Sequence, residues 1–125
     1  MITDRTQEDV DYAIAHPEDN TDLKGAYNNS DLNRVENKVD ELRNLLESYG
    51  YHVNIEEVKT DWLKTDIFNE TDEFRYLNNL RILRQSFYVM QSTPQVPTNM
   101  RSFNYQEAND IEKILVDIDY LIKSM

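Results

Sequence analysis

Residues 30–49 read SDLNRVENKVDELRNLLESY, and this stretch decides the fold. Asn29 and Ser30 are favourable N-cap residues before Asp31 in the first turn, and Gly50 stands where a helix exits through a left-handed conformation. The apolar side chains recur at alternating spacings of three and four residues, which predicts one amphipathic helix over 30–49. The members of this stripe are Leu32, Val35, Val39, Leu42, Leu46 and Tyr49.

Two further stretches carry the same helical period. In residues 105–123, Asn104 followed by Glu107 three positions later predicts a capping box at the start of a second helix. Residues 72–88 place apolar groups over about half of a helix circumference, which predicts a third helix between two neighbours. The apolar residues of the two helices are Ala108, Ile111, Leu115, Ile118 and Ile122, and Phe74, Tyr76, Leu77, Leu80, Leu83, Phe87 and Tyr88.

A shorter helix is predicted near the N-terminus, over residues 6–15. Thr6 and Asp9 have the spacing of a capping box. His16 precedes Pro17, and a residue before proline avoids helical geometry, so we expect the helix to end there with His16 at its terminus.

The connections between these helices differ in character. Residues 17–29 are polar and predict a loop or arm that joins the first helix to the others. Residues 51–56 alternate apolar and polar side chains, which predicts a short extended segment lying on the bundle. Residues 91–104 contain two prolines and predict an extended crossover.

These elements predict an all-α fold and a single domain over residues 1–125. We expect an N-terminal helix and arm in 1–29, and an antiparallel bundle of three main helices with extended connections in 30–125. Two glycines and three prolines are few for the turns of an all-β protein of 125 residues. The predicted core comprises Val39, Leu42, Leu46, Leu77, Leu80, Leu83, Ile111, Leu115 and Ile118.

Composition excludes several classes of function. The net charge of −11 disfavours binding to nucleic acid or to an anionic membrane surface, because both require positive charge. The absence of cysteine excludes disulfides and thiolate metal sites. No apolar run approaches the roughly 20 residues that cross a bilayer, and the N-terminus lacks a secretory signal, so we expect a soluble chain.

Charge is unevenly distributed between two of the predicted helices. Residues 74–90 contain Arg75, Arg81 and Arg84 and no acid, whereas residues 105–125 carry an excess of acids. We therefore expect these two helices to neutralise each other. A basic helix for nucleic acid is the weaker alternative, since the rest of the chain would repel phosphate.

The sequence offers little for catalysis. His16 and His52 are the only imidazoles and have no metal-ligand spacing, and we expect His52 to be exposed. Glycines at positions 25 and 50 alone exclude phosphate-binding loops and the nucleophile elbow. We predict no enzymatic activity, no catalytic residue, no cofactor and no metal.

Three groups of acidic residues leave an alternative open. We interpret them as solvated surface and, for the third group, as the N-terminus of a helix. Weak cation binding, or a carboxylate-dependent cell-wall glycosidase that uses two converging acids, is the alternative. The groups are Glu18, Asp19 and Asp22; Glu56 and Glu57; and Glu70, Asp72 and Glu73.

Aromatic and apolar residues outside the predicted helices are candidates for binding a partner. Trp and Tyr are enriched in protein interfaces, although most aromatic residues serve packing between helices. The candidates lie in segments that have no assigned place in the helical core: Tyr27, Tyr51, Val53, Ile55 and Trp62.

Five stretches together resemble a protein family. They are ITDRTQEDV (2–10), KGAYNNSDLNRVE (24–36), YGY (49–51), KTDW (59–62) and YQEANDIE (105–112). In this order they resemble a module of tail- or baseplate-associated structural proteins of phages and prophages from Gram-positive gut bacteria. Proteins with this module are often longer than this chain, so the resemblance leaves three alternatives open: a complete tail component, a small accessory protein or a fragment.

The resemblance implies a non-enzymatic virion component made in the cytoplasm of the bacterial host, and it implies no catalytic residues. Its partners would be other virion proteins and, as a homo-oligomer, a second copy of the chain. The alternative is a small acidic protein that binds a host protein.

Overall fold

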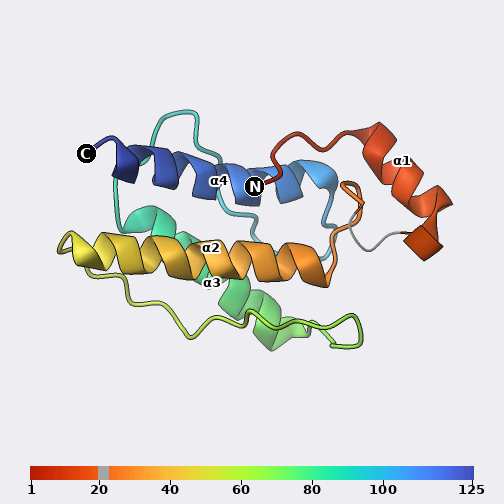
Figure 1. Ribbon diagram of the computed structural model, residues 1–125, viewed down its shortest axis with the longest axis horizontal. Coiled ribbons are helices and arrows are strands. Elements are labelled where there is room, and N and C mark those ends of the chain that lie inside the picture. Colours follow the sequence, from red (N-terminus) through yellow and green to blue (C-terminus); the bar gives the residue numbers. More distant parts are fainter. Residues whose placement is uncertain (20–22) are drawn as a thin grey trace.

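The computed structural model describes residues 1–19 and 23–125 of the chain (Figure 1). Within these residues the structure is all-helical and contains no strand, as predicted. A short N-terminal helix precedes three main helices. The elements are α1 (Gln7–Ala15), the 3₁₀ turn η1 (Pro17–Asp19), α2 (Asn29–Ser48), α3 (Glu70–Gln85) and α4 (Tyr105–Lys123).

Each α-helix begins at a polar cap. Thr6 caps α1 with Asp9 in the predicted capping box. The cap of α2 is Asn28, one residue before the predicted pair, and Asp31 completes its capping box. The Asn104 side chain accepts the backbone N–H of Glu107, which confirms Asn104 as the α4 cap, but the Glu107 side chain does not return the bond that the predicted capping box requires.

The C-terminal ends show one confirmation and one correction. Gly50 has φ +93°, the left-handed conformation expected after α2. Helix α3 ends at Gln85 rather than at residue 88, because the chain turns there and Phe87 packs edge-on against Tyr51, with ring centroids 5.1 Å apart.

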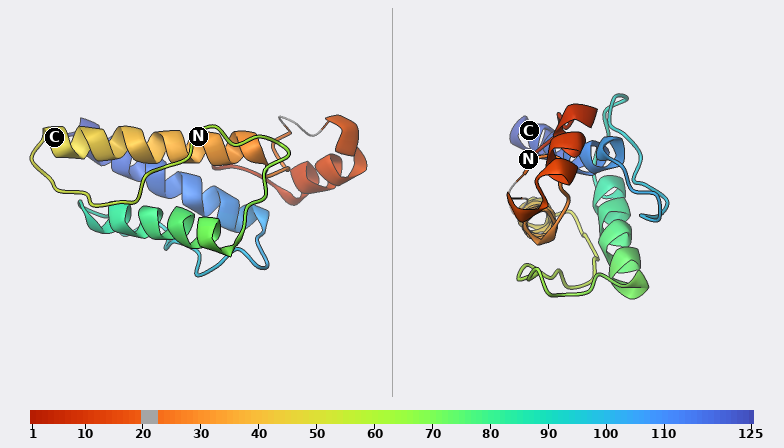
Figure 2. Two further views of the ribbon diagram at one scale, coloured as in Figure 1. Left: turned by 90° about the horizontal axis from the view of Figure 1, so that it is seen from below. Right: turned by 90° about the vertical axis from the view of Figure 1, so that its right-hand side faces the viewer.

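The three main helices run parallel, so the predicted antiparallel arrangement is wrong. Figure 1 shows α2 and α4 running from right to left, and the left view of Figure 2 shows α3 running the same way. Ion pairs agree, since Arg34 binds Glu112 and Lys38, one turn further along α2, lies 3.7 Å from Asp119.

The length of the connections explains this arrangement. Residues 49–69 and 86–104 each contain about 20 residues, and an extended chain of that length spans about 65 Å, twice the length of a 20-residue helix. Each connection therefore returns along the bundle to the end at which the previous helix began (Figure 2). Our prediction had assumed that neighbouring helices would be antiparallel, which requires only short loops.

Hydrogen bonds attach both connections to the bundle along their length. In the first connection, the Asn79 side chain of α3 accepts the N–H of Glu56 and donates to its carbonyl, at 3.0 Å each. In the second, Thr93 donates its hydroxyl to the buried Asp117 of α4 at 2.5 Å. These bonds satisfy backbone and side-chain groups that have no helix or sheet partner.

Parallel packing brings the positive ends of three helix dipoles to one end of the bundle. Acidic residues in the first turns offset this charge. They are Asp31 in α2, Glu70, Asp72 and Glu73 in α3, and Glu107 in α4. This position confirms the interpretation of the third acidic group as a helix N-terminus.

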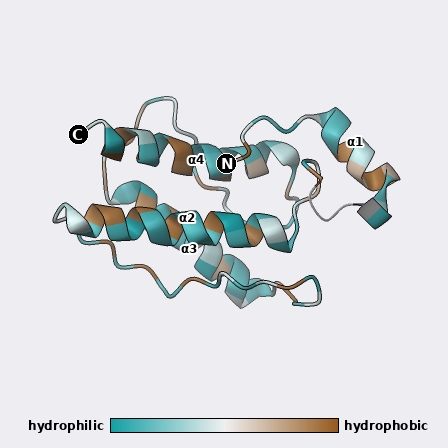
Figure 3. Ribbon diagram, viewed as in Figure 1, coloured by the Kyte–Doolittle hydropathy of each residue, from teal (hydrophilic) through white to brown (hydrophobic). Residues whose placement is uncertain are grey.

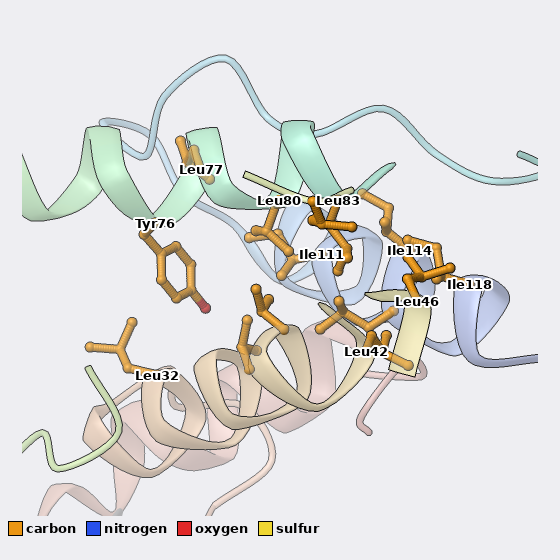
Figure 4. Packing of buried hydrophobic residues seen from close by; sticks show 14 of the residues in the cluster. Leu32, Leu42, Leu46, Tyr76, Leu77, Leu80, Leu83, Ile111, Ile114 and Ile118 are labelled. Carbon is orange, nitrogen blue, oxygen red and sulfur yellow. The ribbon is translucent and has the colours of Figure 1, made fainter. Parts of the chain in front are cut away.

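All nine predicted core residues are buried. Figure 3 shows apolar and polar positions alternating along α2, and Figure 4 shows Tyr76 reaching from α3 towards Leu32 of α2. Three residues of the predicted apolar faces are instead exposed: Tyr49 by 56% at the end of α2, Phe74 by 63% near the start of α3, and Tyr88 by 71% just after α3.

Helix α1 stands apart from the three main helices and contacts η1 (Figure 1). Gly25 holds the following segment against it. A Cβ atom at Gly25 would lie 2.0 Å from the Asp9 carbonyl oxygen and 2.5 Å from the Val10 nitrogen. Glycine is therefore required here for close backbone approach.

We predict that Gly25→Ala separates α1 from residues 23–26. Because the clash is with backbone, relief requires movement of a whole segment, at a cost of about 1–3 kcal/mol. Amide hydrogen exchange should become faster in Gln7–Ala15 and stay unchanged in α3 and α4. Gly50→Ala is the control: it also replaces a glycine by alanine and strains the backbone after α2, but its added Cβ atom meets no atom within 4 Å. It should therefore leave hydrogen exchange in α1 unchanged. Unchanged exchange in α1 would contradict the prediction.

Candidate interaction site

The structure places the five sequence-predicted partner residues against the core. Val53 and Trp62 are buried, with 2% and 4% of their surface exposed. Tyr27, Tyr51 and Ile55 are partly buried and pack on the same cluster. The segments that had no assigned place in the predicted core therefore pack on it: four of these residues lie in the first connection, and Tyr27 lies just before α2.

Trp62 is held by a buried carboxylate that the sequence did not single out. Its Nε1–H donates to Glu36 Oε2 at 2.6 Å, and Glu36 is 2% exposed. Arg75 of α3 also donates to Glu36 Oε2, at 3.1 Å, and the Lys59 N–H donates to Oε1 at 3.1 Å. Glu36 therefore fastens the first connection between α2 and α3.

A second buried cluster ties the N-terminal segment to the bundle. Arg5 Nη2 donates to Glu112 Oε2 at 2.5 Å and to Asp31 Oδ1 at 3.3 Å. Arg34 donates to both Glu112 oxygens at 2.8 Å and to Asp31 at 2.6 Å. The Ile2 N–H adds a bond to Glu112 Oε1 at 3.0 Å. The side chain of Glu112 is fully buried, and that of Arg5 is 2% exposed.

The environment of Glu112 determines its protonation. Burial raises the pKa of its carboxyl, but the hydrogen bonds from Arg34, the Ile2 N–H and Arg5 outweigh this effect, so the pKa lies below its ordinary value. The carboxylate stays ionised and paired with two guanidinium groups.

These contacts correct the expected charge pairing. The arginines of α3 do not bind the acids of α4. Arg75 pairs with Glu36 of α2, whereas Arg81 donates to the Pro97 carbonyl at 2.9 Å and Arg84 to the Pro94 carbonyl at 2.9 Å. The second connection lies between these arginines and α4, and its carbonyl groups take the place of the carboxylates.

A hollow of about 580 Å³ opens at the end of the bundle where the three helix N-termini meet. We call it the N-terminal hollow. It draws residues from the start of α2, from the first connection, from the first turn of α3 and from the end of the second connection. Its lining is Tyr27, Asn28, Asn29, Leu32, Trp62, Leu63, Lys64, Asp66, Phe68, Glu73, Met100 and Phe103.

Aromatic rings form much of its wall. Tyr27 packs edge-on against Phe103, with centroids 4.9 Å apart, and Trp62 against Phe68, with centroids 5.5 Å apart. Two of the five sequence-predicted residues, Tyr27 and Trp62, therefore lie here together. Val53, Ile55 and Tyr51 lie elsewhere along the first connection.

The two carboxylates of the hollow accept hydrogen bonds from backbone N–H groups. Asp66 Oδ2 accepts the Leu63 N–H at 2.8 Å, and Glu73 Oε1 accepts the Met100 N–H at 3.2 Å. Both acids thus fix the conformation of the loops at the rim. The glycosidase alternative requires a different arrangement, in which one carboxyl group with a raised pKa points at the substrate as general acid.

Other chemical candidates are also placed by the structure. His16 caps the C-terminus of α1 and stacks on Tyr12, and His52 is exposed; both agree with expectation.

The side chains of Asp19 and Asp22 lie outside the described residues. Burial, with a smaller contribution from Glu107, raises the pKa of Asp110, which lies on α4 away from the hollow's lining. Over residues 1–19 and 23–125, no group of three or more His, Asp or Glu side chains could hold a metal ion.

Comparison of the chain with protein-family models, with curated proteins and with solved structures finds no match. In the described part of the chain, no helix combines the length and apolar character needed to cross a bilayer.

Proposed function

We propose that this chain is a non-enzymatic assembly or adaptor module of a phage or prophage tail or baseplate, and that the N-terminal hollow binds a protein partner. The observation that carries the proposal is the apolar rim of this hollow. Leu63, which lines it, is 63% exposed, and Ile67, next to the lining residue Phe68, is 82% exposed.

Two features of the rim support binding to a protein. Large apolar side chains in water gain free energy when a partner covers them, and an aromatic-walled hollow offers a pocket for an anchoring side chain. The loop that carries the rim is held by the turn from the Leu63 carbonyl to the Asp66 N–H at 3.0 Å and by the Asp66 side chain. Such a loop loses little conformational freedom on binding.

The resemblance of five stretches of sequence to tail- and baseplate-associated proteins supports the assembly role. Three of these stretches, 24–36, 59–62 and 105–112, contribute residues to the N-terminal hollow or to the helix starts beside it. Mass spectrometry of purified virions from a phage or induced prophage that encodes this chain tests the role. The chain should be present; its absence from intact virions would overturn the proposal and favour a host-protein target.

The rim can be tested by substitution. We predict that Leu63→Ser combined with Ile67→Ser lowers incorporation into virions by about tenfold, because burial of two large apolar side chains is lost from the contact. Stability should change by under about 1 kcal/mol, since both side chains are exposed.

Tyr120→Ser is the matched control. Tyr120 is also 63% exposed but lies towards the C-terminal end of α4, at the opposite end of the bundle. Incorporation should be unaffected by this change. Equal incorporation of the rim variant and the control would show that the hollow is not the contact.

A further inference from the structure

Arg81 and Arg84 of α3 form no ion pair within the described residues. Arg81 directs Nη2 to the carbonyls of Pro97 and Thr98, at 2.9 and 3.1 Å. Arg84 directs Nε to the carbonyl of Pro94 at 2.9 Å and Nη2 to that of Thr93 at 3.2 Å. A guanidinium has five N–H groups, so each arginine keeps donors, including Nη1, that no described residue accepts.

These two side chains line a small hollow of about 100 Å³, together with Gln85, Gln95 and Val96. We call it the arginine hollow. Guanidinium groups bind carboxylates with charge-assisted hydrogen bonds, and a hollow of this size admits the end of one acidic side chain. In a chain of net charge −11, two uncompensated arginines side by side are an exception to the surface around them.

A complementary surface lies on the first connection. Glu56 and Glu57 are exposed and form no ion pair within the described residues. They border a hollow of about 470 Å³ that is also lined by the half-buried Ile55 and Val58 and by Asp40 and Arg43, which pair with each other at 2.9 Å. This surface offers free carboxylates beside apolar side chains.

The two surfaces face in different directions from α3. Asn79 binds the backbone of Glu56, and Arg81 binds the second connection; these two residues are about 200° apart around the helix. The right-hand view of Figure 2 shows the two connections on opposite sides of α3. One chain therefore presents carboxylates, which accept hydrogen bonds, on one side of α3 and guanidinium donors on the other.

We propose that copies of this chain associate head to tail, with Glu56 and Glu57 of one copy contacting Arg81 and Arg84 of the next. Charge complementarity between the two faces carries the inference. Such a heterologous contact generates a closed ring or an open filament rather than a two-fold dimer. The inference rests on the proposed assembly role and names one partner, a second copy of the chain.

The test is sedimentation velocity of the purified full chain at about 0.15 M salt, where general repulsion is screened beyond roughly 8 Å. The wild type should self-associate below about 1 mM. Glu56→Lys with Glu57→Lys should weaken association by tenfold or more. The control, Glu8→Lys with Glu18→Lys, makes the same change of net charge, from −11 to −7, on exposed residues of the N-terminal region.

The control separates a specific contact from general repulsion. If overall charge governed association, both double variants would associate more tightly, because both repel themselves less. Gln95→Glu places a carboxylate in the arginine hollow without removing either arginine, and should also weaken association. Mixing Gln95→Glu with Glu56→Lys/Glu57→Lys should restore one contact, between the unaltered glutamates of the first variant and the unaltered arginine hollow of the second, and so give a mixed dimer.

A monomeric wild type at 1 mM, equal association of the two lysine variants, or no restoration in the mixture would each overturn the proposed contact. Mass spectrometry of purified virions tests the assembly role separately. A chain that is present in virions yet monomeric in solution would overturn this inference alone.

Discussion

Glu112→Gln is expected to destabilise the protein by about 3–5 kcal/mol, the effect of breaking a buried ion pair from one side. The amide keeps the shape of the carboxyl group but not its charge, so Arg5 and Arg34 lose the carboxylate that both bind. Urea unfolding followed by circular dichroism measures the loss. Glu57→Gln, at an exposed position that forms no ion pair with any described residue, should change stability by under about 0.5 kcal/mol.

The same variant should alter the pH dependence of stability. Because the pKa of Glu112 is lowered on folding, its contribution is fully present above the ordinary value of 4.5 and is lost as pH falls below it. The difference in unfolding free energy between wild type and Glu112→Gln should therefore shrink as the pH falls below about 4.5. A difference independent of pH in this range would contradict the assignment.

Trp62→Ala is expected to cost about 3–5 kcal/mol, the range for removing a large buried aromatic side chain. The ring packs between Phe68 and the core, and its Nε1–H satisfies Glu36. Trp62 is the only tryptophan, so circular dichroism rather than fluorescence must follow unfolding.

Trp62→Phe separates packing from the hydrogen bond. It keeps an aromatic ring but removes the donor to Glu36, which stays paired with Arg75. We expect a smaller loss of about 1–2 kcal/mol. A loss below about 1 kcal/mol in Trp62→Ala would mean that residues 51–62 do not lie on the core as described.

Local patterns were sufficient to predict the helices and most of the core. The three- and four-residue spacings in 30–49 and 105–123 mark a stripe that has to be buried, whatever covers it. Capping is equally local, so Thr6, Asn104 and Gly50 could be assigned from their neighbours in sequence.

The N-terminal hollow was accessible to sequence reasoning only in part. Tyr27 and Trp62 were predicted as candidates because they are aromatic residues outside the helices, and both line the hollow. Leu63 and Ile67 carry no pattern that distinguishes an exposed apolar residue from a buried one, so the rim was missed. The same reasoning wrongly left Val53 unassigned, because alternation predicts an extended segment without indicating what it packs against.

The sequence by itself determined which stretches form helices, most of their ends, and which face of each is apolar. The end of α3 at Gln85 was an exception, because Phe87 packs against Tyr51 of the first connection. Only the tertiary structure decided that α2, α3 and α4 run parallel, and that Glu36 and Glu112 are buried with arginines from distant segments. The physical reason is that helix formation depends on contacts three and four residues apart. Helix direction and buried ion pairs depend instead on where connections of about 20 residues place groups far apart in the chain.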